Sequence, residues 1–193
     1  MPSSPIIDLV AGARPNFMKL APVLRDVEAD GRLAPRVIHT GQHYDRNLSG
    51  VFFNDLGIPA PAVHLEVGSG PHGAQTARVL ERYEAHLRAS PPAATVVFGD
   101  VNSTVACALA AAKLHIPVAH VEAGLRSFDR AMPEEINRVL TDSIADLHFV
   151  SEPAGVENLR REGVAESSIH HVGNSPEGLI PTADLLISAG FSR

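Results

Sequence analysis

Short apolar segments alternate along the chain with longer segments whose apolar residues recur at helical spacing. The apolar segments predict strands at residues 6–11, 36–40, 95–98, 117–121, 147–150 and 169–172, and a short extended segment at 63–67. The periodic segments predict helices at residues 15–30, 48–56, 73–89, 103–114, 133–144 and 153–162. Strands that alternate with helices in this way are typical of an α/β fold with a parallel sheet and right-handed crossovers.

The composition narrows the class of protein. The chain has 193 residues, enough for one substantial domain, and a formal net charge of -6 without a cluster of Lys or Arg. Because Trp is absent and aromatic residues are sparse, nucleic-acid binding is not expected. Cys107 is the only cysteine, so we expect no intrachain disulfide and no Cys-based metal site, and its apolar neighbours predict a core position. The sequence predicts no signal peptide and no membrane-spanning helix, and hence a soluble cytoplasmic protein.

Polar residues follow the first two predicted strands, at the edge where a parallel sheet binds its ligands. Gly12 permits a tight turn, and Pro15 opens the helix that follows. Arg14 and Lys19 at this helix start suit a phosphate, because the free N–H groups there favour anions. An ordinary turn with two surface cations explains them equally well. His43, after the second strand, is either a hydrogen-bond donor or proton carrier for a substrate, or a structural loop residue.

Two carboxylates follow the next central strands. Asp100 comes two residues after the end of one of them, and Asn102 or Ser103 is expected to cap the following helix. Asp100 is therefore either a ligand-facing carboxylate or a part of this turn. Glu122 follows another apolar strand, where a buried carboxylate is costly unless it is paired or catalytic. If pairing is the explanation, Arg126 is the expected partner.

Further charged residues open the helix predicted at 133–144. Glu134 and Glu135 lie in its first turn, where the helix dipole favours acidic side chains. Arg138 lies four residues beyond Glu134, at the spacing of a helical ion pair. Carboxylates and cations gathered at one edge of a sheet suit proton transfer next to a phosphate-bearing substrate. The sequence has neither His and Cys spacing typical of zinc nor a Gly-x-Ser-x-Gly segment typical of a hydrolase.

Five segments follow one another along the chain: Gly12-Ala-Arg-Pro-Asn-Phe-Met-Lys19, Gly41-Gln-His-Tyr-Asp45, Gly99-Asp-Val-Asn-Ser-Thr104, His120-Val-Glu-Ala-Gly-Leu-Arg126 and Pro133-Glu-Glu-Ile-Asn-Arg138. In this order they resemble the bacterial non-hydrolysing UDP-N-acetylglucosamine 2-epimerases. The resemblance implies a Rossmann-like, doubly wound parallel sheet that is one half of a glycosyltransferase type B architecture. It implies an amino-terminal domain over residues 1–174 and a divergent tail over 175–193, which is expected to be helical. We expect the sequence up to Arg193 to lack the family's second nucleotide-binding domain.

The resemblance also implies an activity, the interconversion of UDP-N-acetylglucosamine and UDP-N-acetylmannosamine. In the family, the C2 proton is removed, UDP is expelled and added back, and C2 is reprotonated on the other face. The carboxylates that match the family's catalytic positions are Asp100, Glu122 and Glu134. The residues that match its substrate contacts are Arg14, Lys19, His43 and Arg138. The match leaves open which carboxylate removes the proton.

The expected partners are UDP-N-acetylglucosamine and UDP, without a metal or a redox cofactor. The resemblance further suggests a cytoplasmic homodimer that serves cell-surface polysaccharide biosynthesis. Because most uracil and ribose contacts belong to the family's second domain, the chain alone is expected to have weak or no epimerase activity. Two alternatives stay open. One is a hydrolysing UDP-N-acetylglucosamine 2-epimerase that releases free UDP, and the other is a sugar-nucleotide-binding remnant, or a partner-dependent subunit, without activity of its own.

Overall fold

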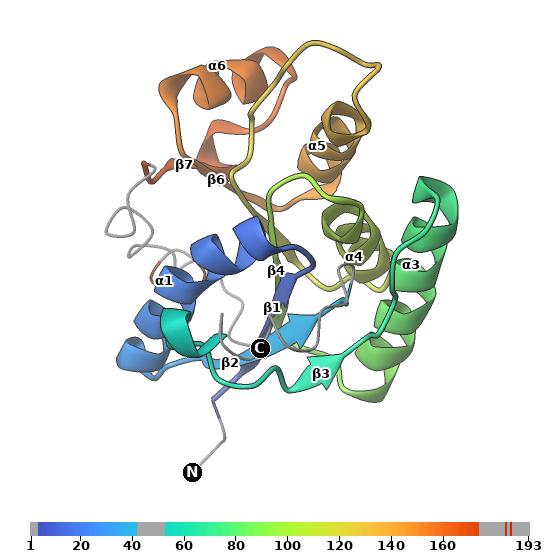
Figure 1. The fold of residues 1–193 in the computed structure, drawn as a ribbon. Coiled ribbons are helices and arrows are strands. Elements are labelled where there is room, and N and C mark those ends of the chain that lie inside the picture. The colour runs from blue at the N-terminus through green and yellow to red at the C-terminus, as the bar shows by residue number, and fades with distance from the viewer. Residues whose placement is uncertain (1–3, 42–52, 174–183, 185, 187–193) are drawn as a thin grey trace.

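The structure is a computed structural model that describes residues 4–41, 53–173, 184 and 186. Within these residues, seven strands form one sheet in the order β3-β2-β1-β4-β5-β6-β7 (Figure 1). All neighbouring strands run parallel. The strands are β1 (Ile6–Ala11), β2 (Ala34–His39), β3 (Val63–His64), β4 (Ala94–Phe98), β5 (Val118–Val121), β6 (Leu147–Val150) and β7 (Ile169–His171). The predicted α/β fold with a parallel sheet is confirmed.

Helices connect the strands. The described ones are α1 (Arg14–Asp30), α3 (His72–Ala89), α4 (Asn102–Lys113), α5 (Pro133–Ile144) and α6 (Pro153–Arg161), with a short 3₁₀ turn, η1 (Glu166–Ser168). Proline lies in the first turn of α1, α5 and α6, where no N–H partner is needed. Gly31 ends α1 in the left-handed conformation, with φ 73°, and its N–H donates to the carbonyl of Val27.

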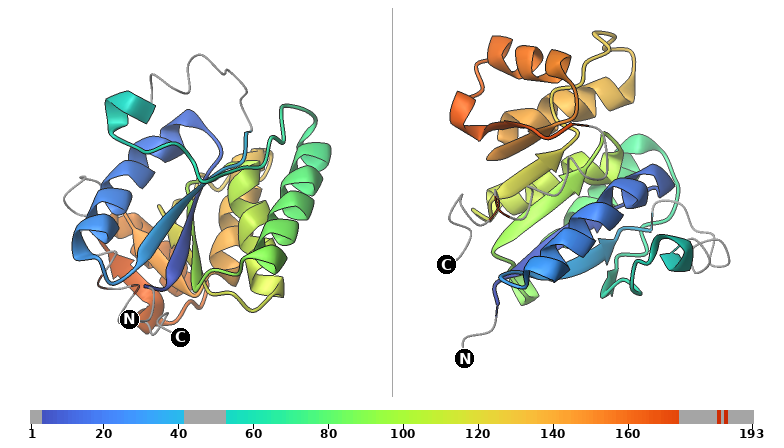
Figure 2. Two further views of the ribbon diagram at one scale, coloured as in Figure 1. Left: turned by 90° about the horizontal axis from the view of Figure 1, so that it is seen from below. Right: turned by 90° about the vertical axis from the view of Figure 1, so that its left-hand side faces the viewer.

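The sheet lies between two layers of helix, as Figure 2 shows with α1 on one face and α3 and α4 on the other. Side chains of alternate residues in β1 point to opposite faces of the sheet. Leu9 packs in the core under α1, and Val10 packs in the core under α3 and α4. Because both faces are buried, the central strands are almost continuously apolar. This arrangement is the Rossmann-like, doubly wound sheet that was expected, and it brings the carboxyl ends of β1, β4 and β5 to one edge.

Most predicted elements are confirmed, and one detail is wrong. Neither Asn102 nor Ser103 caps α4, because Val101 occupies the N-cap position and no side chain bonds the helix end there. Asn102 is instead the first helical residue, and its side-chain amide donates to Oε1 of Gln75 on α3 at 2.8 Å. Cys107 is fully buried in α4, as predicted.

Two predicted helices fall largely outside the described residues. Of the helix expected at 48–56, residues 53–56 are described and helical. Of the tail, Asp184 and Leu186 are described and helical, and the Leu186 side chain is fully buried in the core under α1. The division of the chain at residue 174 stays a prediction.

Candidate active site

Three turns meet at the carboxyl edge of the sheet because β1, β4 and β5 are neighbours. The β1–α1 turn and the β4 end are joined by Asn16, whose Oδ1 accepts the Ala13 N–H at 3.1 Å and whose Nδ2 donates to the Phe98 carbonyl at 2.7 Å. The β4 and β5 ends are joined by the Gly99 N–H, which donates to the Val121 carbonyl at 3.0 Å. The predicted site residues on these turns therefore lie together.

Glu122 is paired with Lys19, not with Arg126 as the sequence suggested. Lys19 Nζ on α1 forms an ion pair with Glu122 Oε2, 103 residues away in the sequence. Both side chains stay partly exposed, by 31% and 21%, so the carboxylate is within reach of a ligand. Arg126 points instead into the protein, where it pairs with Asp142. The costly carboxylate after β5 is thus compensated by a cation from the first predicted anion site.

The backbone of Glu122 is unusual. Its φ of 75° lies in the left-handed region, which costs a residue with a side chain about 1–2 kcal/mol. Gly99 has φ 67° and packs against the same carboxylate, since a Cβ there would lie 2.9 Å from Asn16 Nδ2 and 3.4 Å from Glu122 Oε2. Strained conformations of this kind concentrate at functional sites, where a side chain must be held in one place.

Asp100 is held by Arg138 of α5. Arg138 Nη2 lies 2.5 Å from Asp100 Oδ2, and its Nη1 lies 3.0 Å from Glu135 Oε2. Arg138 therefore does not pair with Glu134, although the spacing of four residues suggested it. Glu134 is partly exposed and forms no ion pair or hydrogen bond with the residues that the structure describes. Asn137 Nδ2 fixes the same turn by donating to the Asp100 carbonyl at 2.9 Å.

Glu135 is a structural carboxylate that the sequence suggested only as a partner of the helix dipole. It is 3% exposed and accepts the N–H groups of Ser127 and Phe128 at 2.9 and 3.0 Å. Burial acts to raise the pKa of Glu135, but these N–H groups and Arg138 outweigh burial, so the pKa lies below its ordinary value. An ionised Glu135 thus folds the β5–α5 loop and holds Arg138 towards Asp100.

The remaining predicted residues have different outcomes. Arg14 is exposed in the first turn of α1, where a ligand at the carboxyl edge can reach it. His43 lies outside the described residues. The sequence did not indicate that three asparagines connect the turns of the site, because only the folded chain brings their distant hydrogen-bond partners close. They are Asn16, Asn102 and Asn137.

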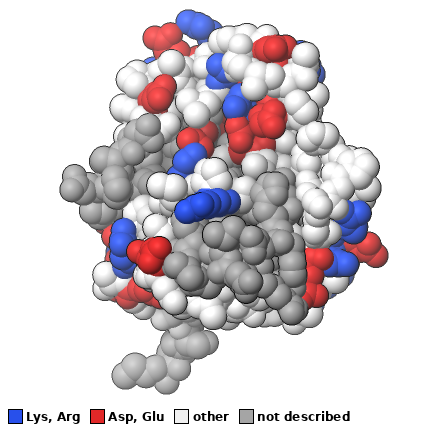
Figure 3. All heavy atoms as spheres, in the orientation of Figure 1, with Lys and Arg blue, Asp and Glu red and all other residues white. Residues whose placement is uncertain are grey.

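Opposite charges lie side by side in the site. Lys19 and Arg138 each neutralise a predicted catalytic carboxylate, and Figure 3 shows acidic and basic side chains intermixed on this face of the molecule. Among the described residues, no group of three His, Cys, Asp or Glu side chains is arranged to hold a metal ion. No helix in the described ranges is long and apolar enough to cross a membrane. The arrangement can exchange protons and bind an anion.

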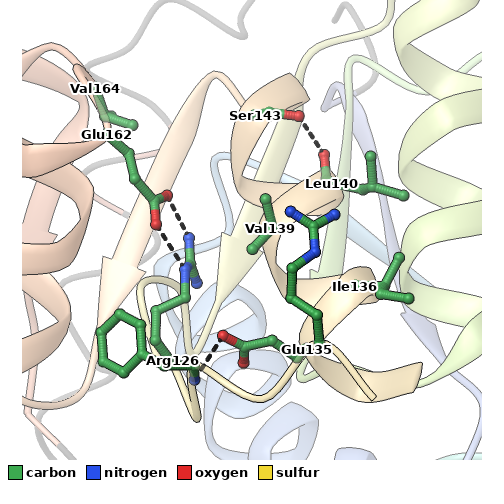
Figure 4. A pocket seen from close by; sticks show the side chains of 10 residues that line it. Arg126, Glu135, Ile136, Val139, Leu140, Ser143, Glu162 and Val164 are labelled. Atoms are coloured by element: carbon green, nitrogen blue, oxygen red, sulfur yellow. Dashed lines mark hydrogen bonds and ion pairs between the residues drawn. The ribbon is translucent and has the colours of Figure 1, made fainter. Parts of the chain in front are cut away.

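A cavity of about 530 Å³ lies beside this site, not within it. Figure 4 shows it between α5, α6 and the β5–α5 loop, with Glu135 and Arg126 at its wall. Arg126 forms two hydrogen bonds with the Glu162 carboxylate there, at 2.8 and 2.6 Å. None of the predicted catalytic carboxylates lines this cavity, so it is not the predicted catalytic centre.

A doubly wound parallel sheet with a helix start and two cation-paired carboxylates at its carboxyl edge defines a Rossmann-like domain suited to a phosphate-bearing ligand. Comparison with known proteins gives the family. The chain belongs to the UDP-N-acetylglucosamine 2-epimerase family, whose sequence model matches residues 25–177. This is an isomerase family, as the resemblance of the five segments implied.

Relatives of known name support the assignment. A UDP-N-acetylglucosamine 2-epimerase from Methanocaldococcus jannaschii is 47% identical over 169 residues, which cover 88% of this chain and 46% of the relative. A UDP-2,3-diacetamido-2,3-dideoxy-D-glucuronate 2-epimerase from Pseudomonas aeruginosa is 47% identical over 154 residues, covering 80% of this chain and 44% of the relative. The crystal structure of the M. jannaschii enzyme in complex with UDP-GlcNAc and UDP has a TM-score of 0.84 and 47% identity, covering 88% of this chain and 46% of that one. The chain thus spans about half the length of the curated relatives it matches.

Proposed function

We propose that this chain binds the diphosphate of UDP-N-acetylglucosamine and carries proton-transfer groups for inversion at C2. One observation carries the proposal: Asp100 and Glu122 are partly exposed carboxylates, each held by a cation, on adjacent turns beside the start of α1. The solved relative with UDP-GlcNAc and UDP bound supports the choice of ligand.

The cations have two roles in this proposal. Arg14 and Lys19 bind the diphosphate at the amino-terminal end of α1, where the helix dipole also favours an anion. Lys19 is shared with Glu122, so an arriving diphosphate competes for the ammonium group and leaves the Glu122 carboxylate available to the sugar. Arg138 keeps Asp100 oriented, and His43 is proposed as a supporting ligand contact.

The carboxylates Asp100, Glu122 and Glu134 surround the sugar in this proposal. One of them takes the proton from C2, and the C1–O bond breaks as its electron pair leaves with UDP. The intermediate is 2-acetamidoglucal, the unsaturated sugar with a double bond between C1 and C2. UDP then adds back to C1, and a protonated carboxyl group delivers a proton to the opposite face of C2. Positioned acid–base groups contribute about 10²–10⁴-fold to such a reaction, and cations stabilise the departing diphosphate.

Deuterium exchange at C2 tests the proposal. The chain is incubated with UDP-N-acetylglucosamine in D₂O, and proton NMR follows the C2–H signal and the appearance of UDP-N-acetylmannosamine. We expect slow incorporation that Glu122→Gln reduces by about 100-fold or more. The matched control is Glu157→Gln, because Glu157 is also paired with a cation, Arg161, but lies exposed on α6. A folded chain that binds UDP without any exchange would contradict the catalytic part of the proposal and favour a binding subunit.

A second substrate is a specific alternative. The P. aeruginosa relative, named for a diacetamido glucuronate, is as similar in sequence as the M. jannaschii relative, named for N-acetylglucosamine, at 47% identity each. Running the same exchange assay with both UDP-sugars decides between them. Measuring free UDP in the same samples separates epimerisation from the hydrolysing alternative, in which free UDP accumulates in step with sugar release.

We also propose that the chain forms a homodimer in the cytoplasm and serves cell-surface polysaccharide synthesis. A stripe of apolar side chains along α5 and the loop before it supports pairing with a second copy. Its members are Phe128, Met132, Ile136 and Leu140, which are 75%, 38%, 41% and 49% exposed. Sedimentation analysis tests this surface: Leu140→Glu should give a monomer. A wild-type monomer at high concentration would contradict the dimer. Cell fractionation tests the location.

A further inference from the structure

A cluster of buried charges lies directly beneath two of the catalytic turns. It consists of His120 on β5, Asp142 on α5 and Arg126 in the loop between them. His120 is fully buried, Asp142 is 2% exposed, and the side chain of Arg126 is 1% exposed. Nothing in the proposed chemistry uses this cluster, and none of its members is exposed enough to touch a substrate. Burying three ionisable groups costs free energy unless they are paired and hydrogen-bonded. The hydrogen-bond partners of these groups therefore indicate their role.

The Asp142 carboxylate reaches both carboxylate-bearing turns. Its Oδ1 lies 2.6 Å from His120 Nδ1, and the other ring nitrogen of His120, Nε2, donates to the Gly99 carbonyl at 2.9 Å. Gly99 directly precedes Asp100. The second carboxylate oxygen of Asp142, Oδ2, accepts the N–H of Gly124 at 3.0 Å. Gly124 lies two residues after Glu122. One side chain thus holds one catalytic turn through an imidazole and the other directly.

The geometry also fixes the protons. The Gly99 carbonyl can only accept, so His120 Nε2 carries a proton. Asp142 Oδ2 lies 2.8 Å from Arg126 Nη1 and accepts the Gly124 N–H, so these contacts make Asp142 an ionised acceptor. Burial acts to raise the pKa of Asp142, but His120 and Arg126 outweigh burial, so the pKa lies below its ordinary value. An ionised Asp142 accepts from Nδ1, so the ring is protonated on both nitrogens. Glu162 also pairs with Arg126. The two positive charges, on His120 and Arg126, therefore balance the two negative charges, on Asp142 and Glu162.

We propose that Asp142 is a positioning residue that sets the relative placement of Asp100 and Glu122. The doubly protonated His120 ring is the rigid link between Asp142 and the Gly99–Asp100 turn. The catalytic consequence rests on the proposed function, whereas the structural link stands on the contacts alone. Positioning of this kind matters because small displacements of catalytic groups cost large factors in rate.

Nuclear magnetic resonance tests the link without activity. In the wild-type chain, His120 should show two protonated ring nitrogens, and the Gly124 amide should exchange slowly with solvent. Asp142→Ala should speed exchange at Gly124 by about tenfold or more, because a hydrogen bond to a charged group is lost. Asp142→Asn keeps the shape and should leave His120 with its Nε2 proton alone. This second variant keeps the test decisive if the alanine variant does not fold.

Asp146→Ala is the matched control. Asp146 Oδ2 also accepts a backbone N–H of β5, that of Val118 at 2.8 Å, but at the opposite end of the strand from the site. The control should leave the Gly124 amide and the His120 ring unchanged. A single ring proton in the wild type, an unchanged Gly124 amide in Asp142→Ala, or an equal change in Asp146→Ala would overturn the proposal.

Activity adds a separate reading. Asp142→Asn should lower the rate of C2 exchange by about tenfold while the affinity for UDP stays unchanged, because Arg14 and Lys19 are untouched. An equal loss of UDP affinity would contradict a positioning role. If the wild type shows no exchange at all, the proposed catalytic function of this chain fails, whereas the ring and amide signals still decide the role of Asp142.

Discussion

The strained backbone at Glu122 predicts that function and stability conflict at this residue. With φ 75°, the left-handed conformation costs a residue with a side chain about 1–2 kcal/mol, which glycine does not incur. The ion pair with Lys19 is partly exposed and contributes at most about 1 kcal/mol. Glu122→Ala and Glu122→Gly both remove this pair, so the difference between the two variants isolates the backbone. We expect the glycine variant to be more stable than the alanine variant by about 1 kcal/mol.

Urea unfolding followed by circular dichroism measures this difference in unfolding free energy. In thermal unfolding, about 1 kcal/mol corresponds to a shift in Tm of about 2–4 °C for a domain of this size. Glu157, in the middle of α6, is the matched control because its backbone is helical. There glycine should be less stable than alanine by about 1 kcal/mol, so the sign of the difference reverses. Both variants at Glu122 should lose C2 exchange. Equal stabilities, or a less stable glycine variant at position 122, would refute the reasoning.

Three further predictions follow from packing and burial. Gly124→Ala should prevent stable folding, because a Cβ there would lie 2.4 Å from the carbonyl oxygen of Gly155, whereas Gly163→Ala, with φ 84° and open space around it, should cost only about 1–2 kcal/mol in urea unfolding. Burial lowers the pKa of His39 from 6.5 to about 4. Above pH 6.5 His39 is neutral in both the folded and the unfolded chain, and its contribution to the unfolding free energy is fully present. This contribution, up to about 3 kcal/mol, should be lost as pH falls from 6.5 to 4, and His39→Leu should flatten that part of the wild-type curve of unfolding free energy against pH. Burial also raises the pKa of the Cys107 thiol, so iodoacetamide should label it in urea and not in the native chain; rapid native labelling would show that α4 is not packed as described.

The sequence predicted those parts of the molecule that depend on local pattern. The central strands were visible because both faces of the sheet are buried there, which makes β1 and β4 almost continuous apolar segments. Asp100 and Glu122 were visible because each lies within two residues of the end of an apolar strand, at the edge where ligands bind. The order of the five segments then pointed to the family that the comparison confirms.

The pairing of charges could not be predicted in the same way. Lys19 and Glu122 are 103 residues apart, and no local spacing connects them. The spacing rule suggested Glu134 as the partner of Arg138. In the fold, Arg138 instead contacts Glu135, which the β5–α5 loop holds. Asp142 gave no signal, because its role depends on partners from β5 and from two turns that only the folded sheet brings together.

Mapping UDP onto the folded chain tests the central claim, that the carboxyl edge of the sheet binds the nucleotide diphosphate. A titration followed by amide chemical shifts needs no turnover, and uridine without phosphate serves as the matched ligand. The account predicts that UDP shifts the amides of Arg14, Lys19, Gly99 and Glu122, that uridine shifts them far less, and that Lys19→Met weakens the UDP response. Shifts confined to the α5 face around Ile136, or equal responses to UDP and uridine, would contradict it.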